Sequence, residues 1–127
     1  MRDFCVEQEE TSDILAYIGE ILGEAGVNIE GLCLISCDGL HIIHFVVEDS
    51  VTARCVLEKS GIRIRDESEV FILHKDAKCV TGKPGSFGGI CRTLADHDIK
   101  IKFGYPAENN RFVLGVDDVV KASILLK

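Results

Sequence analysis

Apolar residues recur along the first part of the chain with the spacing of a helix. Between 13 and 25 they form one stripe, at Ile14, Leu15, Ile18, Ile21, Leu22 and Ala25. Thr11 or Ser12 can supply a polar N-cap, and Gly26 follows as a residue that ends helices in a left-handed conformation. The pattern therefore predicts an amphipathic helix with one buried face.

The spacing then changes to alternation, which is typical of β-strands. Residues 28–36 alternate between two faces, and Asp38-Gly39 after them is a strong hairpin signal. Residues 41–47 are apolar and largely β-branched, which predicts a central strand. The other elements expected in the first half are a strand at 2–7, a helix capped by Ser50 and ending at Ser60-Gly61, and a strand at 62–65.

The second half repeats this order of elements. We expect strands at 70–74, 99–105 and 112–116, a turn at 106–110, and helices at 85–97 and 118–126. Residues match at two constant spacings, in the pairs Ile18/Ile90, Leu22/Leu94, Val27/Ile99 and Ile29/Ile101, and then Val47/Val116, Asp49/Asp118, Ala53/Ala122 and Leu57/Leu126. A period of about 70 residues with matching core positions indicates a duplication.

The order β-α-β-β-α-β closes most simply as an antiparallel sheet with two helices on one face. We expect one unit in 1–66 and a second in 67–127, which stops at Lys127 before its last strand. The edge of strand 70–74 then needs a partner, either strand 62–65 or another copy of the chain in a homodimer. The residues expected to face the sheet from the first helix of the second unit are Phe87, Ile90 and Leu94.

Composition indicates a globular protein and excludes several classes of partner. The 127 residues are 46% apolar with two prolines, which is enough for a buried core. A net charge of −7 without a basic stripe argues against nucleic acid and anionic membranes as partners. The N-terminus soon turns acidic and no apolar run is long enough to span a bilayer, so we expect a cytoplasmic protein.

Six cysteines suggest a disulfide or metal site, but their spacing does not. Cys33 and Cys37 are too far apart along one predicted strand to bridge, and there is no CxxC or HxxxH pattern. The cysteines within apolar periodic segments, which we expect to be buried thiols, are Cys5, Cys33, Cys55 and Cys91. We therefore expect neither a metal nor another cofactor.

Three short segments resemble the ACT family, and in their order the resemblance covers nearly the whole chain. They are Leu-Gly-Glu-Ala-Gly-Val-Asn-Ile at 22–29, Gly-Lys-Pro-Gly-Ser-Phe at 82–87, and Tyr-Pro-Ala-Glu-Asn-Asn at 105–110. The last is similar to the hairpin of a subfamily of small stand-alone tandem ACT proteins. The resemblance implies an α+β fold of two tandem ferredoxin-like (βαββαβ) units, the second without its last strand. It also implies regulatory binding of an amino acid.

The resemblance further implies that a ligand lies between paired units, held by a Pro-Gly loop of one and the start of the second strand of the other. The first copy has an acidic segment at 8–13 in place of that loop, and the second has Lys100 where the first has Asn28. One composite site per chain is then expected. Its residues are Lys83, Pro84, Gly85, Ser86, Phe87 and Asn28.

Plainer interpretations of the same residues stay open. The glycines at 85–89 can equally form a turn and a close helix packing, and Asn28 can be a turn residue. Asn109 and Asn110 fit a hairpin better than a ligand site, and Tyr105 fits core packing better than a lid. The histidines, which we expect to have ordinary structural roles, are His41, His44, His74 and His97.

The same architecture serves other functions, so fold alone does not decide between them. A metal chaperone needs paired cysteines after its first strand, and an RNA-binding module needs a basic aromatic platform. An acyl-phosphate hydrolase needs an arginine in an anion-binding loop, whereas Arg92 lies inside a predicted helix. We therefore expect no enzyme. The alternative to an amino-acid regulator is an interaction module, or a regulatory subunit whose ligand site has decayed.

Overall fold

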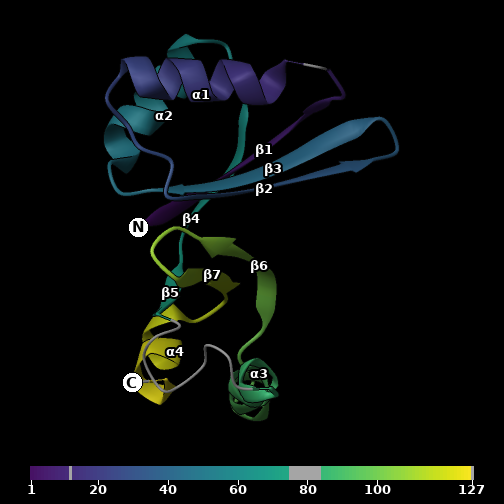
Figure 1. Ribbon diagram of the computed structural model, residues 1–127, viewed down its shortest axis with the longest axis vertical. Coiled ribbons are helices and arrows are strands. Elements are labelled where there is room, and N and C mark those ends of the chain that lie inside the picture. The colour runs from purple at the N-terminus through teal and green to yellow at the C-terminus, as the bar shows by residue number, and fades with distance from the viewer. Residues whose placement is uncertain (12, 75–83, 127) are drawn as a thin grey trace. The chain divides into compact units, whose positions relative to one another are not determined.

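The computed structural model describes residues 1–11, 13–74 and 84–126, which divide into two compact units, 1–68 and 69–127 (Figure 1). The elements of the first unit are β1 (Arg2–Glu9), α1 (Ile14–Glu24), β2 (Gly31–Cys37), β3 (Leu40–Val47), α2 (Ser50–Lys59) and β4 (Ile64–Glu69). Those of the second are β5 (Phe71–His74), α3 (Ser86–Asp96), β6 (Ile101–Ala107), β7 (Arg111–Val116) and α4 (Val119–Leu125).

The strands of the first unit follow the order β4-β1-β3-β2. Strand β3 is central, as predicted, because it pairs antiparallel with both β1 and β2. The turn between β2 and β3 has left-handed φ angles of 51° at Asp38 and 79° at Gly39, which confirms the predicted hairpin. Successive side chains of a strand point to opposite faces, so Ile43, Phe45 and Val47 lie on one face of β3, and all three belong to the core.

Helices α1 and α2 cover one face of this sheet (Figure 1). Ile18 and Leu22 from α1 and Leu57 from α2 are fully buried. They pack in one cluster with Phe4 and Phe45, whose rings stack with centroids 5.6 Å apart. The predicted helical stripe is therefore the face that builds the core.

The second unit has the strand order β6-β7-β5, the counterpart of β2-β3-β1 in the first. Its core joins Leu94 of α3 and Ala122 of α4 to Leu114 and Val116 of β7. Because 114 and 116 alternate along the strand, both helices pack on the same face of the sheet. The shared strand order confirms the predicted α+β fold with repeated antiparallel units.

The helix ends also match between the copies. The N–H of Val27 donates to Leu22 O at 2.9 Å, and that of Ile99 donates to Leu94 O at 3.0 Å. The paired caps behave alike, because Asp49 accepts from the N–H of Thr52 and Asp118 accepts from the N–H of Lys121. The predicted spacings therefore correspond to equivalent local structure.

Several local predictions were wrong. The N-cap of α1 is Asp13 rather than Thr11, although its side chain makes no capping hydrogen bond. The N-cap of α2 is Asp49 rather than Ser50, because the Asp49 carboxylate accepts from the free N–H of Thr52. Ser12, the other predicted cap, lies outside the described residues. Pro106 belongs to β6, paired with Phe112, so the turn begins only at Glu108.

Two further predictions need correction. Strand β4 pairs with β1 in the first unit, so it is not the partner predicted for the edge at 70–74. Cys55 is exposed on α2, because its position on the helix points away from the core that Ala53 and Leu57 enter. No helix in the described part of the chain is both long and apolar enough to cross a membrane.

Candidate functional site

The structure describes the predicted ligand loop from Pro84 on, where the N-terminus of α3 begins. Gly85 is its N-cap, with a left-handed φ of 84°, and as a glycine it makes no side-chain hydrogen bond to the helix end. Pro84 and Gly85 are exposed, and Ser86 is half-buried. Lys83 lies outside the described residues. The first turn contains no acidic residue, so the positive end of the helix dipole is not offset there by a carboxylate of that turn.

Phe87 was expected to face the sheet, and the structure places it at the margin of the core. Its side chain is 40% exposed, and its ring lies 5.0 Å from that of Phe112, tilted by 57°. Leu94, two turns further on, is fully buried as predicted. Phe87 therefore anchors the start of α3 on β7 while keeping one face at the surface.

Asn28 precedes β2 in the first unit, and its side chain is exposed. Its amide donates a hydrogen bond to the carboxylate of Glu30. The corresponding residue of the second unit is Lys100, whose backbone N–H donates to Asp117 Oδ1 at 3.0 Å. The hypothesis that Asn28 completes the site at α3 stays a prediction.

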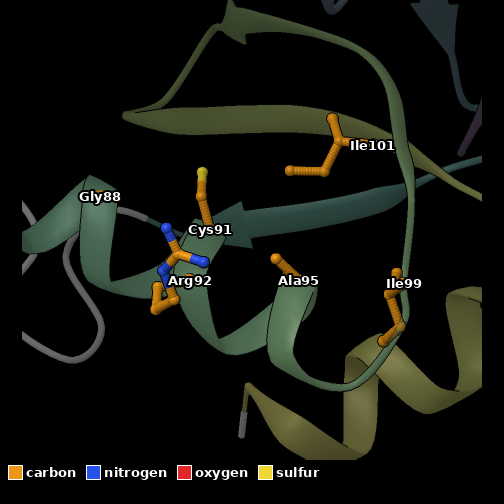
Figure 2. A pocket seen from close by; sticks show the side chains of 6 residues that line it. All are labelled: Gly88, Cys91, Arg92, Ala95, Ile99 and Ile101. Atoms are coloured by element: carbon orange, nitrogen blue, oxygen red, sulfur yellow. The ribbon is translucent and has the colours of Figure 1, made fainter.

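A groove of about 330 Å³ runs along the same helix (Figure 2). The residues that line it are Gly88, Cys91, Arg92, Ala95, Ile99 and Ile101. The first four recur at helical spacing on one side of α3, and the two isoleucines come from the segment that leads into β6. The Ile101 side chain is 40% exposed and points toward Cys91 in Figure 2.

Among the described residues of this lining, Arg92 is the charged one, and its side chain is 75% exposed. Its guanidinium lies 3.8 Å from Asp96 Oδ1, a long and solvated ion pair. Burial raises the pKa of the Cys91 thiol, so this group stays protonated at neutral pH and acts as an apolar wall. The groove therefore joins an apolar floor to one cation.

Sequence reasoning missed this groove. The sequence places Arg92 inside a helix rather than in an anion-binding loop, so its position did not indicate a role in binding. The signal that could have found it is the helical spacing of Gly88, Arg92 and Ala95, three exposed positions away from the buried Leu94.

The corresponding face of α1 has the opposite charge. At the first repeat spacing, Arg92 corresponds to Glu20, and Gly88 and Ala95 correspond to Ala16 and Gly23. All three of these α1 residues are exposed. The carboxylates that precede α1, Glu9, Glu10 and Asp13, are exposed as well. The first unit thus presents acidic groups at both places where the second presents positive potential.

A second pocket, of about 440 Å³, lies in the first unit and is lined by Glu7, Glu9, Leu40, Arg63, Ile64 and Arg65. Its two carboxylates and two guanidinium groups balance. Arg65 donates a hydrogen bond to Glu7 at 2.5 Å, so one of the two cations of this pocket is already paired within the pocket.

The other chemically active side chains have structural roles. His41 Nε2 lies 3.0 Å from Thr11 O, and His97 Nδ1 lies 2.8 Å from Thr93 O. His44 Nδ1 lies 2.8 Å from the buried carboxylate of Asp3. Within the described ranges no group of histidines, cysteines and carboxylates is arranged to hold a metal ion. Tyr105 is buried, as core packing requires, and Asn109 and Asn110 have the left-handed φ angles of a hairpin turn.

Solved structures share this fold over almost the whole chain. Protein BT0572 from Bacteroides thetaiotaomicron matches 98% of the chain and 85% of its own length, with 19% identity and a TM-score of 0.78. The regulatory subunit of aspartate kinase from Thermus thermophilus matches 98% of the chain and 87% of its own length, with 14% identity and a TM-score of 0.70.

Escherichia coli aspartokinase III, solved in complex with lysine and aspartate, matches 99% of this chain but only 30% of its own. The identity is 10% and the TM-score 0.52. No family model and no curated protein matches the sequence. At these identities the likeness concerns the fold alone, and it confirms the architecture that the sequence resemblance implied: the chain has the fold of tandem ACT units.

Proposed function

We propose that this protein is a non-catalytic regulator that binds an amino acid, with one site per chain, and that it acts as a cytoplasmic homodimer. The observation that carries the proposal is the exposed N-terminus of α3, where the N-cap Gly85 makes no side-chain capping hydrogen bond. The corresponding N-terminus in the first unit follows Glu9, Glu10 and Asp13. An asymmetric pair of helix ends favours one anionic ligand group rather than two.

The chemistry suits the two charged ends of an amino acid. Backbone N–H groups at the start of α3 can receive a carboxylate, which the helix dipole favours by about 0.3–1 kcal/mol. The side-chain carbonyl of Asn28 can accept from an ammonium group, and Glu30 beside it adds a negative charge. Lys83, Pro84, Ser86 and Phe87 complete the proposed ligand set.

The solved structures with this fold support regulation as the role. One of them is the regulatory subunit of an aspartate kinase, and another is an aspartokinase in complex with lysine and aspartate. We therefore propose an amino acid, or a similar small carboxylate, as the ligand class.

Calorimetry against the twenty amino acids tests the proposal, and we expect one ligand bound at the Gly85 site per chain. Gly85→Asp should abolish binding at this site, while Gly85→Asn should largely keep it, since Asp and Asn both tolerate a left-handed φ and only Asp adds a negative charge. Asn28→Ala should weaken binding by about 1–3 kcal/mol, because the ammonium group of the bound ligand would lose its hydrogen-bond acceptor. Glu9→Ala is the control and should bind like the unmodified protein.

Two sites of equal affinity per chain, or unchanged binding by Asn28→Ala, would rule out the composite site. If no amino acid binds while light scattering finds a tight oligomer, the interaction module becomes the better account. A monomer at tens of micromolar, where ordinary protein dimers persist, would remove the homodimer from the proposal.

A further inference from the structure

The groove along α3 is set apart from the N-terminus of that helix. Arg92 comes seven residues after Gly85, which is about 10 Å along the axis at 1.5 Å per residue. One small carboxylate cannot contact the first-turn N–H groups and the Arg92 guanidinium together. The groove must therefore be considered as a site by itself.

Its lining has the composition of a small-ligand site, with an apolar floor and one orienting polar group. Of the two isoleucines that line the groove, Ile101 is 40% exposed and Ile99 is 4% exposed. Cys91 and Ala95 extend the apolar surface along the helix (Figure 2). A volume of about 330 Å³ is at the small end of ligand pockets, which limits the occupant to a few heavy atoms beyond its polar head.

Arg92 supplies the recognition of charge. Its guanidinium has five N–H donors in a planar fork that matches a carboxylate. The 3.8 Å separation from Asp96 and the 75% exposure of the side chain leave these donors able to turn toward the groove. None of the six lining residues has a side-chain carboxylate, amide or hydroxyl that could accept a hydrogen bond from an ammonium group.

We propose that this groove binds a small aliphatic monocarboxylate, with the carboxylate on Arg92 and the hydrocarbon on Ile99 and Ile101, and that it does not recognise an α-ammonium group. A branched-chain 2-oxo acid or fatty acid then binds as well as the amino acid of the same skeleton. This site is independent of the amino-acid site proposed at Gly85. The first unit has no counterpart, because Glu20 stands at the position of Arg92.

The experiment compares four compounds with one skeleton: leucine, 4-methyl-2-oxopentanoate, 4-methylpentanoate and leucinamide. Binding to the full chain is followed by calorimetry and by chemical shifts of the Ile99 and Ile101 methyl groups. To keep the first site out of the measurement, the titrations are done in a Gly85→Asp background as well. We expect the three carboxylates to bind within about threefold of one another, and leucinamide about tenfold more weakly or not at all.

Matched variants assign the contacts. Arg92→Gln should weaken the two acids without an ammonium group by about tenfold or more, and Arg92→Lys should keep part of the affinity. Gly88→Leu should block the groove, because the leucine side chain would occupy it. The variant should still fold, since a Cβ at Gly88 meets no atom within 4 Å and leucine favours the helix. Glu20→Gln is the control at the matching position of α1 and should change nothing.

Three results would each overturn the inference. They are leucine binding tenfold more tightly than the 2-oxo acid in the Gly85→Asp background, Arg92→Gln binding both acids like the unmodified protein, and no methyl shift with any aliphatic carboxylate up to about 10 mM. If the Gly85→Asp variant binds the 2-oxo acid but no longer binds leucine, the groove discriminates against an ammonium group, contrary to the proposal. Failure of the Gly85 site with the groove intact would instead count only against the amino-acid site.

Discussion

Glu67 ties three elements of the first unit together. Its carboxylate accepts hydrogen bonds from Arg54 on α2, at 2.6 Å from both Nε and one terminal nitrogen, and from Arg2 Nε on β1, also at 2.6 Å. The Glu67 side chain is 14% exposed, while both arginines are about 40% exposed. The hydrogen bonds from Arg54, followed by those from Arg2, lower the pKa of Glu67 against the opposing effect of burial.

A lowered carboxylate pKa makes a pH-dependent contribution to stability. The contribution is complete above the unfolded-state pKa of glutamate, about 4.3, and is lost as the pH falls through the lower folded-state value. Glu67→Gln should therefore reduce the free energy of unfolding by about 1–2 kcal/mol at pH 7, since the arginine partners are partly solvated. The deficit should shrink in acid, because the protonated wild-type side chain then resembles the amide.

Urea unfolding of both proteins at a series of pH values measures this difference. Glu24→Gln, at an exposed position of α1, is the control and should track the unmodified protein. A deficit that stays constant down to the acid transition would show that Glu67 acts through its shape rather than its charge.

At the scale of elements, the ends of α1 and α3 adopt one geometry with different residues. Gly26 has φ 77° after α1, and Asp98 has φ 58° at the corresponding place after α3. Each N–H donates to the carbonyl three residues back, Gly23 O at 3.0 Å and Ala95 O at 3.1 Å. Glycine adopts this left-handed conformation with the least strain, whereas aspartate tolerates it at some cost.

Asp98→Gly should accordingly stabilise the protein, by about 0.5–1 kcal/mol, and Gly26→Asp should destabilise it by a similar amount. Thermal and urea unfolding of the two variants and the double exchange give the comparison. The backbone hydrogen bonds are common to all of them, so only the left-handed strain differs. If Asp98→Gly loses stability, the aspartate side chain must make a favourable contact that outweighs this strain.

At the scale of the whole molecule, the two units differ in the size of their cores. Among the described residues the main cluster of the first unit contains twelve buried side chains and that of the second contains five. Buried apolar area is the main favourable contribution to folding, so the second unit should open at lower free energy. We expect its most protected amides to exchange with free energies about 1–3 kcal/mol below those of the first unit.

Native-state hydrogen exchange measures both units in one experiment. Leu22→Ala and Leu94→Ala are matched core deletions at fully buried, corresponding positions, each expected to cost about 2–5 kcal/mol. Each should lower protection mainly in its own unit. Equal exchange free energies, with both variants lowering protection everywhere, would mean that the chain opens as a single cooperative body.

Much of the fold is already determined by the sequence, because the forces that set it are local and periodic. The helical stripe ending at Gly26 and the hairpin at Asp38-Gly39 depend on backbone preferences a few residues long. The duplication could be read from pairs such as Leu22/Leu94, since equivalent core positions demand similar side chains. The structure contains each of these features, and only the ends of the elements differ, by a few residues.

The rest was decided by tertiary structure, because it depends on distance rather than order. Whether Asp49 or Ser50 caps α2 follows from which side chain reaches the free N–H, and the exposure of Cys55 follows from the rotation of α2 against the core. The groove exists only because Ile101, nine residues beyond Arg92 and on another element, lies beside α3. Linear spacing alone could not show that an apolar strand residue and a helical guanidinium would line the same surface.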